Sequence, residues 1–358
     1  MKMKEAEITD KIAQKAKALF EDKRFIEVLS ANELKREVSA DNRRADFEMN
    51  VKLKNGKKYR IVFEVKSVGQ PRYVRSAVNQ LQSCLNNGKN SYGIVGAPYL
   101  SEESINICRD NNVGCVDLAG NCYIEFENIF IQIKGNPNPF MTTRHQKSLF
   151  AAKSTRVLRA LLCQPGKKWR ISELAKEAEV SLGQTANVKK KLLDDEYIME
   201  DEFKRIVLKN PDSLLKKWVD SYSYRQNKIY NFYSLDTSQQ VEQQIGEYCN
   251  LNNIKYAFTL TTGADIVNPF LRYKRVFLYL KPENINAVSR DLRWKSVETG
   301  PNITVLEPYD EGVFYGIQDI RKKKVVSDIQ LYLDLQSYKE RGEEAAEQIY
   351  EKRIKPEW

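Results

Sequence analysis

Histidine is almost absent from this sequence, and so are several other features that identify common classes of enzyme. The only histidine is His145, so Ser–His–Asp or Cys–His catalysis would depend wholly on that one side chain. The six cysteines include no C-x-x-C pair, and with a single histidine they form no recognisable zinc set. We expect reduced thiols, most of them buried.

Long apolar runs are missing as well. No run approaches the roughly 20 residues that a membrane-spanning helix needs. Residues 1–10 are charged, so no secretory signal is visible. These features together predict a cytoplasmic protein without a membrane partner.

What is present is an ordinary globular composition with a basic excess. The chain has 358 residues, which is long for one core and predicts two or three domains. Its net charge of +10 favours a polyanionic partner, and nucleic acid is the obvious one. The basic residues are spread along the whole chain, so a merely soluble basic protein is the alternative.

Two alternating runs flank Asn55-Gly56, a dipeptide suited to a tight hairpin turn. Period two places Asp46, Glu48, Glu64 and Lys66 on one side of this hairpin, whose other side is apolar. Carboxylates can hold Mg²⁺ or Mn²⁺ through oxygen, and a lysine can orient an attacking water. The alternative is a solvated strand face with alternating charges.

The segment around this hairpin predicts a first domain over residues 1–140. An amphipathic helix precedes the hairpin, and strands and helices alternate after it up to the break at 135–139. This order predicts a mixed α/β sheet with helices on its faces.

Residues 141–212 predict a winged helix-turn-helix, because three amphipathic helices are followed by two short strands. Ser181 is the expected N-cap of the third helix. The residues predicted to contact double-stranded DNA lie on that helix and on the wing: Ser181, Gln184, Thr185, Asn187, Lys190, Lys191, Lys204 and Arg205. A protein–protein module is the alternative use of such a domain.

Residues 213–358 predict a second, smaller α/β domain. The aromatic segment from Asp212 to Tyr233 is expected to be helical. The run T-T-G-A-D at 261–265 faintly resembles the opening of a nucleotidyltransferase, but no aspartate pair follows it at a useful spacing. We interpret it as a turn into a buried helix.

A family resemblance extends through this order of segments. The segments that carry it are E-V-K (64–66), G-Q-P-R-Y (69–73), A-P-Y (97–99), V-D-L-A-G-N (116–121), G-N-P-N-P-F (135–140), V-S-L-G-Q-T (180–185), N-P-D-S-L-L (210–215), V-S-D-I-Q-L-Y-L-D-L (326–335) and R-G-E-E-A-A-E (341–347). Their order resembles chromosomal relatives of the AbiEi-type antitoxins of type IV toxin–antitoxin systems. The resemblance implies a bacterial autoregulator that binds operator DNA and antagonises a nucleotidyltransferase-like toxin without a stable complex. A homodimer is one arrangement open to such a regulator.

The N-terminal domain is an addition to the minimal members of that family, and it resembles the PD-(D/E)XK, or restriction-endonuclease-like, fold. The resemblance implies that Asp46 and Glu64 are metal ligands, with Glu48 as an alternative to Asp46. It implies that Lys66 completes an E-x-K motif and that Gln80 lies on the following helix as a further catalytic candidate.

Three hypotheses follow from the sequence. The first is a DNA-binding transcriptional regulator of antitoxin type, which need not be an enzyme. The alternative is a Mg²⁺-dependent DNA endonuclease that uses Asp46, Glu64 and Lys66. In the third, the N-terminal domain only dimerises or docks a partner, which predicts an apolar exposed sheet edge or helix face.

Overall fold

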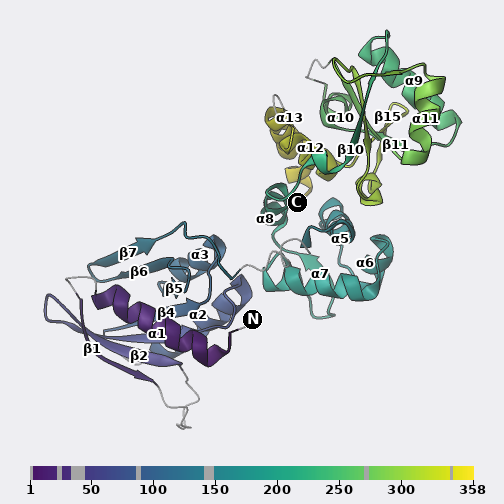
Figure 1. Cartoon of the computed structure of the whole chain (residues 1–358). Coiled ribbons are helices and arrows are strands. Elements are labelled where there is room, and N and C mark those ends of the chain that lie inside the picture. Colours follow the sequence, from purple (N-terminus) through teal and green to yellow (C-terminus); the bar gives the residue numbers. More distant parts are fainter. Residues whose placement is uncertain are drawn as a thin grey trace. The chain divides into compact units, whose positions relative to one another are not determined.

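The computed structural model describes residues 3–21, 26–33, 45–85, 90–140, 149–269, 274–338 and 342–358. His145 lies outside these ranges. The chain forms two compact units (Figure 1). Unit 1 comprises Met1–Thr143 with Leu193–Glu196, and unit 2 comprises Arg144–Leu192 and Tyr197–Trp358. The division at residue 212 stays a prediction.

Unit 1 contains a curled mixed sheet of seven strands whose order across the sheet follows the chain. The strands are β1 (Ile26–Glu33), β2 (Phe47–Leu53), β3 (Lys58–Val65), β4 (Ser91–Ala97), β5 (Gly114–Asp117), β6 (Cys122–Phe126) and β7 (Ile129–Ile133). The central pairs β3–β4 and β4–β5 are parallel, and the other neighbours are antiparallel. The mixed sheet expected from the sequence is therefore present.

Helices cover both faces of this sheet (Figure 1). Helix α1 (Glu5–Glu21) buries Ile8, Ile12 and Phe20 against one face. The other face is covered by α2 (Pro71–Leu85) and α3 (Glu102–Asp110). Each face needs its own cover because the central strands are apolar on both sides.

Unit 2 begins with three helices and a hairpin. These elements are α5 (Ala152–Cys163), α6 (Ile171–Glu177), α7 (Leu182–Asp194), β8 (Ile198–Glu200) and β9 (Ile206–Leu208). Strand β9 also pairs with the backbone of Trp169, whose amide donates to the carbonyl of Ile206 at 2.9 Å. Ser181 caps α7 as expected, because its hydroxyl accepts from the amide of Gln184 at 3.3 Å.

The remainder of unit 2 is a second seven-stranded sheet with helices around it. Across the sheet the strands are β13 (Lys295–Ser296), β10 (Lys228–Tyr233), β14 (Ile303–Glu307), β12 (Val276–Leu280), β11 (Tyr256–Phe258), β16 (Lys323–Val325) and β15 (Gln318–Ile320). The helices are α8 (Pro211–Val219), α9 (Ser238–Leu251), α10 (Leu260–Val267), α11 (Pro282–Asp291), α12 (Asp328–Gln336) and α13 (Gly342–Ile349). The segment 261–265 lies in α10, which is largely buried, as the sequence suggested.

The prediction of one helix from Asp212 to Tyr233 is wrong. Helix α8 ends at Val219, and Lys228–Tyr233 forms strand β10. The strand is stabilised on both sides, because β10 pairs with β14 and with β13. Tertiary pairing decided between two structures that an aromatic-rich segment can adopt.

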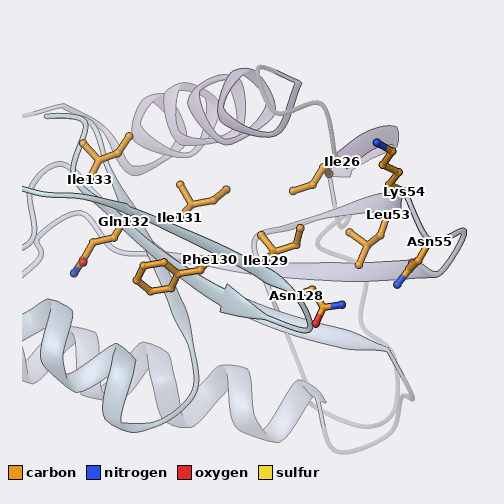
Figure 2. A pocket seen from close by; sticks show the side chains of 10 residues that line it. All are labelled: Ile26, Leu53, Lys54, Asn55, Asn128, Ile129, Phe130, Ile131, Gln132 and Ile133. Carbon is orange, nitrogen blue, oxygen red and sulfur yellow. The ribbon is translucent and has the colours of Figure 1, made fainter.

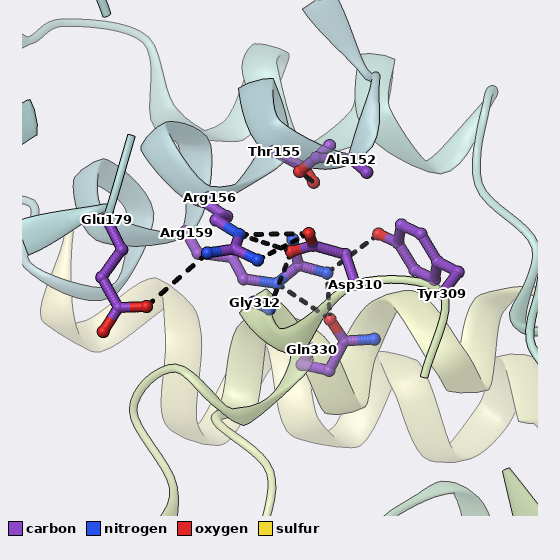
Figure 3. A network of polar contacts seen from close by, with 9 residues as sticks. All are labelled: Ala152, Thr155, Arg156, Arg159, Glu179, Tyr309, Asp310, Gly312 and Gln330. Atoms are coloured by element: carbon purple, nitrogen blue, oxygen red, sulfur yellow. Dashed lines mark hydrogen bonds and ion pairs between the residues drawn. The ribbon is translucent and has the colours of Figure 1, made fainter. Parts of the chain in front are cut away.

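Polar contacts fix α5 against the segment 309–330 (Figure 3). The Arg156 guanidinium donates to both carboxylate oxygens of Asp310 at 2.8–3.1 Å. Arg159 is fully buried, and it donates to Gln330 and to the hydroxyl of Tyr309. A Cβ added at Gly312 would lie 2.7 Å from Oδ1 of Asp310 and 3.0 Å from Cγ of Arg156, so a larger residue there would displace this ion pair.

Two further features complete the fold. All six cysteines are free, and four of them are buried, as expected for most of them. In the part of the chain that the structure describes, no helix combines the length and the apolarity that crossing a bilayer requires.

Candidate functional site

An acidic site lies on unit 1 where β2 begins and β3 ends. Asp46 directly precedes β2, while Glu64 and Lys66 stand at the end of β3. The Asp46 carboxylate accepts a hydrogen bond from the amide of Val65 at 2.6 Å, and its own amide donates to the carbonyl of Phe63. These two bonds hold Asp46 beside the strand that carries Glu64.

Lys66 connects the strand to the helix that follows it. Its ammonium group donates to Oε1 of Glu64 at 2.6 Å and to Oε1 of Gln80, on α2, at 3.4 Å. The structure therefore brings together the side chains predicted from the E-x-K pattern and the glutamine of the next helix. Whether they are catalytic stays a prediction.

Glu64 is the least exposed member of this site. The residue is 4% exposed, and its Oε2 has no hydrogen-bond partner among the residues that the structure describes. Burial raises its pKa to about 7, the nearby charge of Asp46 adds to this effect, and the Lys66 hydrogen bond opposes it. A buried carboxylate with one unsatisfied oxygen is suited to hold a cation, because a cation supplies the missing partner.

The donor set fits a hard divalent cation that keeps part of its water. The described residues contain no group of three or more His, Cys, Asp or Glu side chains placed to hold a metal. Mg²⁺ needs fewer, since it is commonly bound through one or two carboxylates together with water and substrate phosphates. Glu48, the alternative to Asp46, is engaged elsewhere because it accepts from Arg60 at 2.6 Å.

A second group of predicted site residues lies on helix α7. Ser181, Asn187 and Lys190 are exposed. Asn187 offers both an amide donor and a carbonyl acceptor, which is the pair that recognises adenine in the major groove. Lys190 offers a cation for a phosphate.

On α7 the expected outward placement is wrong for Thr185, while Gln184 is partly engaged and its contact with DNA stays a prediction. Thr185 is fully buried, and its hydroxyl donates to the carbonyl of Ser181 at 3.1 Å, so it packs inside the unit and does not face solvent. Gln184 is half-buried, and its amide donates to the hydroxyl of Ser154 on α5 at 2.9 Å. The helical period predicted that both side chains lie on the outer face of α7. It could not distinguish that exposed face from the flanks of the helix that contact neighbouring residues.

Two of the basic residues predicted to contact DNA lie on the hairpin between β8 and β9. Lys204 is exposed and has a positive φ of 57°. Arg205 donates to Asp201 at 2.8 Å and lies over the ring of Phe203, so its charge is partly offset. Lys191, also predicted to contact DNA, is half-buried.

Three further basic residues, absent from the predicted set, lie next to the hairpin. Lys167, Lys168 and Arg170 are exposed and flank Trp169, whose backbone pairs with β9. The ammonium group of Lys167 lies 3.6 Å from the centre of the Trp169 ring. The run K-K-W-R, with basic residues around an aromatic one, is the signal that could have identified them.

Residues 205–355 match the model of a family described as a transcriptional regulator, the AbiEi antitoxin of type IV toxin–antitoxin systems. The match confirms the resemblance inferred from the order of segments for the C-terminal part of the chain. No curated protein matches the chain.

Several solved structures are distantly similar. A repair endonuclease from Pyrococcus abyssi is 19% identical over 33% of this chain and 48% of its own length, with a TM-score of 0.22. EndoMS in apo form is 17% identical over 33% of this chain and 47% of its own, with a TM-score of 0.19. The chain thus spans about half the length of the structures it matches. At these TM-scores the likeness assigns neither a fold nor an activity.

Proposed function

We propose that this protein is a DNA-binding transcriptional regulator of antitoxin type. The observation that carries the proposal is the match of residues 205–355 to a family of such regulators. The elements α5 to β9 support it, since three helices followed by a hairpin have the order of a winged helix-turn-helix. In this proposal the protein represses its own operon and antagonises a nucleotidyltransferase-like toxin without a stable complex.

In the proposed complex α7 enters the major groove. Asn187 reads a base edge, Lys190 contacts a phosphate, and Ser181 places the N-terminus of the helix next to the backbone. Lys204 and the basic residues 167, 168 and 170 contact the flanking phosphates. Gln184 supports the helix through Ser154.

The test measures how the purified full chain binds the DNA upstream of its own gene. Fluorescence anisotropy at several salt concentrations reports this binding. We expect Asn187→Ala to reduce discrimination against altered operators by about 1–3 kcal/mol, because one bidentate base contact contributes this much. Lys190→Ala should weaken binding to all duplexes alike and lower the salt slope by about 1.

Lys17→Ala is the matched control, since it removes the same charge from an exposed position on α1. It should leave both properties unchanged. A protein that does not bind its upstream DNA at low salt, or an Asn187→Ala variant with unaltered sequence preference, would contradict the proposal.

A second candidate function is a Mg²⁺-dependent nuclease on unit 1, and the unpartnered buried Oε2 of Glu64 favours it. Asp46 and Glu64 would hold the cation, which when bound would polarise a phosphodiester and lower the pKa of a water. Lys66 would orient that water or stabilise negative charge on the phosphate, and Gln80 would position the Lys66 ammonium group. The substrate class is DNA.

Two measurements decide this candidate. Mg²⁺ or Mn²⁺ should raise the melting temperature of unit 1 in the wild type but not in Glu64→Gln, because binding stabilises only a folded site. Plasmid cleavage should disappear in Glu64→Gln and in Lys66→Met. Glu48→Gln, on the same face but paired with Arg60, should retain both properties. Cleavage that survives in Glu64→Gln would indicate a contaminating nuclease.

A further inference from the structure

Strand β7 forms one edge of the sheet of unit 1, next to β6 only. Its five residues, I-F-I-Q-I, contain no charge and no proline. Phe130 is 62% exposed and Ile133 is 41% exposed. The edge is therefore apolar and open in the part of the chain that the structure describes.

A hollow of about 580 Å³ accompanies this edge (Figure 2). Ile129, Ile131 and Ile133 lie on one side of β7, and Phe130 and Gln132 on the other. The opposite wall comes from the other end of the curled sheet, where Ile26 of β1 and Leu53 of β2 line the hollow. Ile129 and Ile131 are half-buried against the core of unit 1, whereas Phe130, Gln132 and Ile133 are exposed and would flank a strand that paired with β7.

Open edges of this kind recruit other strands. Natural proteins protect their edge strands with lysine, proline, bulges or inward charges, because the unpaired backbone groups are a template for pairing. Strand β7 has none of these within its five residues, and its partner β6 pairs with it in unbroken register. Strand β7 therefore favours an arrangement in which another strand pairs with its open edge.

The sequence of β7 is complementary to itself in the antiparallel direction. With a two-fold axis at Ile131, Ile129 of one copy lies opposite Ile133 of the other, and Phe130 lies opposite Gln132. No like charges face each other, because the two Lys134 side chains stand at opposite ends of the paired strands. A parallel pairing would instead place Lys134 beside Lys134.

We propose that β7 is a homodimer interface, in which two copies of this chain pair their β7 strands antiparallel about Ile131 and join two seven-stranded sheets into one. The dimer requires neither DNA nor metal, so the inference goes beyond the proposed function and stands or falls separately.

The test is sedimentation velocity of the full chain without DNA. We expect a reversible monomer–dimer equilibrium with a Kd between about 1 and about 100 μM, because one pair of strands forms a small interface and such interfaces are weak. In the double variant F130K/Q132K each lysine faces a lysine of the other copy, so the dimer should weaken roughly tenfold or more. Both positions are exposed, and far-UV circular dichroism checks that the variant is folded.

Complementary charges test the register. F130E/Q132E alone should also be monomeric, whereas an equal mixture with F130K/Q132K should recover a heterodimer, because opposite charges then face each other. Leu251→Lys is the matched control at an apolar position that is 84% exposed, and it should dimerise like the wild type.

A wild type that is monomeric throughout the range overturns the proposal and leaves the edge to a strand of another protein. A dimer that is insensitive to F130K/Q132K overturns it as well, since its interface then lies elsewhere.

Discussion

Glu64 combines three properties that ordinary surface carboxylates lack. It is 4% exposed, one of its oxygens lacks a hydrogen-bond partner in the described part of the chain, and the other accepts from Lys66 at 2.6 Å. Burial disfavours its charged form, and its pKa rises to about 7. Ionisable side chains whose pKa is shifted this strongly are concentrated at functional sites.

The raised pKa of Glu64 makes the stability of unit 1 depend on pH. The unfolded chain releases this proton near the ordinary pKa of 4.5, whereas the folded protein retains it up to about pH 7. The stability therefore declines as the pH rises through this interval, and the loss is complete above it. Glutamine cannot titrate, so Glu64→Gln avoids this loss. We expect its effect on the free energy of unfolding of unit 1 to be more stabilising at pH 8 than at pH 5 by about 2–3 kcal/mol.

Urea unfolding followed by circular dichroism measures this difference. The four tryptophans, Trp169, Trp218, Trp294 and Trp358, all belong to unit 2, so tryptophan fluorescence provides an internal control. Glu64→Gln should leave the fluorescence transition unchanged at both pH values. An equal effect of the variant at pH 5 and pH 8 would show that Glu64 is not the titrating group.

Helix α5 is the element on which the proposed DNA-binding surface depends. Towards α7 it offers Ser154, which accepts from Gln184 at 2.9 Å. Towards the segment 309–330 it offers Arg156 and Arg159, and both are engaged there (Figure 3). The position of α7 is therefore coupled to the region that matches the antitoxin family.

The paired charges of Arg156 and Asp310 should contribute strongly to this coupling. The Asp310 side chain is only 8% exposed, so Arg156→Ala leaves a nearly buried carboxylate without its main partner. We expect Arg156→Ala to destabilise unit 2 by about 3 kcal/mol, since breaking a buried pair costs about 3–5 kcal/mol and this pair is partly exposed. Tryptophan fluorescence during urea unfolding measures the loss.

Arg290→Ala is the matched control for this prediction. Arg290 also donates to an aspartate, Asp291, at 2.9 Å, but its side chain is 77% exposed. Exposed pairs contribute about 0–1 kcal/mol, so this variant should unfold close to the wild type. Equal destabilisation by Arg156→Ala and Arg290→Ala would refute the special role of the buried pair.

At the scale of the whole molecule, the parts that short-range rules describe were predictable. The turn at Asn55-Gly56 and the alternation around it predicted the β2–β3 hairpin and its polar face. Asp46, Glu64 and Lys66 fall on that face because side chains of a strand alternate strictly. Three helices and a hairpin after residue 149 followed from apolar spacing and caps in the same way.

Other features depend on which segments meet in space. The segment Lys228–Tyr233 became a strand because β14 and β13 pair with it. Thr185 was expected to face DNA, but it lies on the buried side of α7. Arg159 is fully buried, and its partners Gln330 and Tyr309 lie more than 140 residues further along the chain.

The sequence by itself determined the local elements and the polar face of the hairpin, because backbone propensity and side-chain period act over a few residues. The order of its segments also indicated the family likeness of the C-terminal part. Only the tertiary structure decided that Glu64 is buried with an unsatisfied oxygen, that Gln184 supports α7 from its flank and that β7 is an open apolar edge. Burial, pKa and exposed edges depend on contacts between distant segments, and no spacing within one segment encodes those contacts.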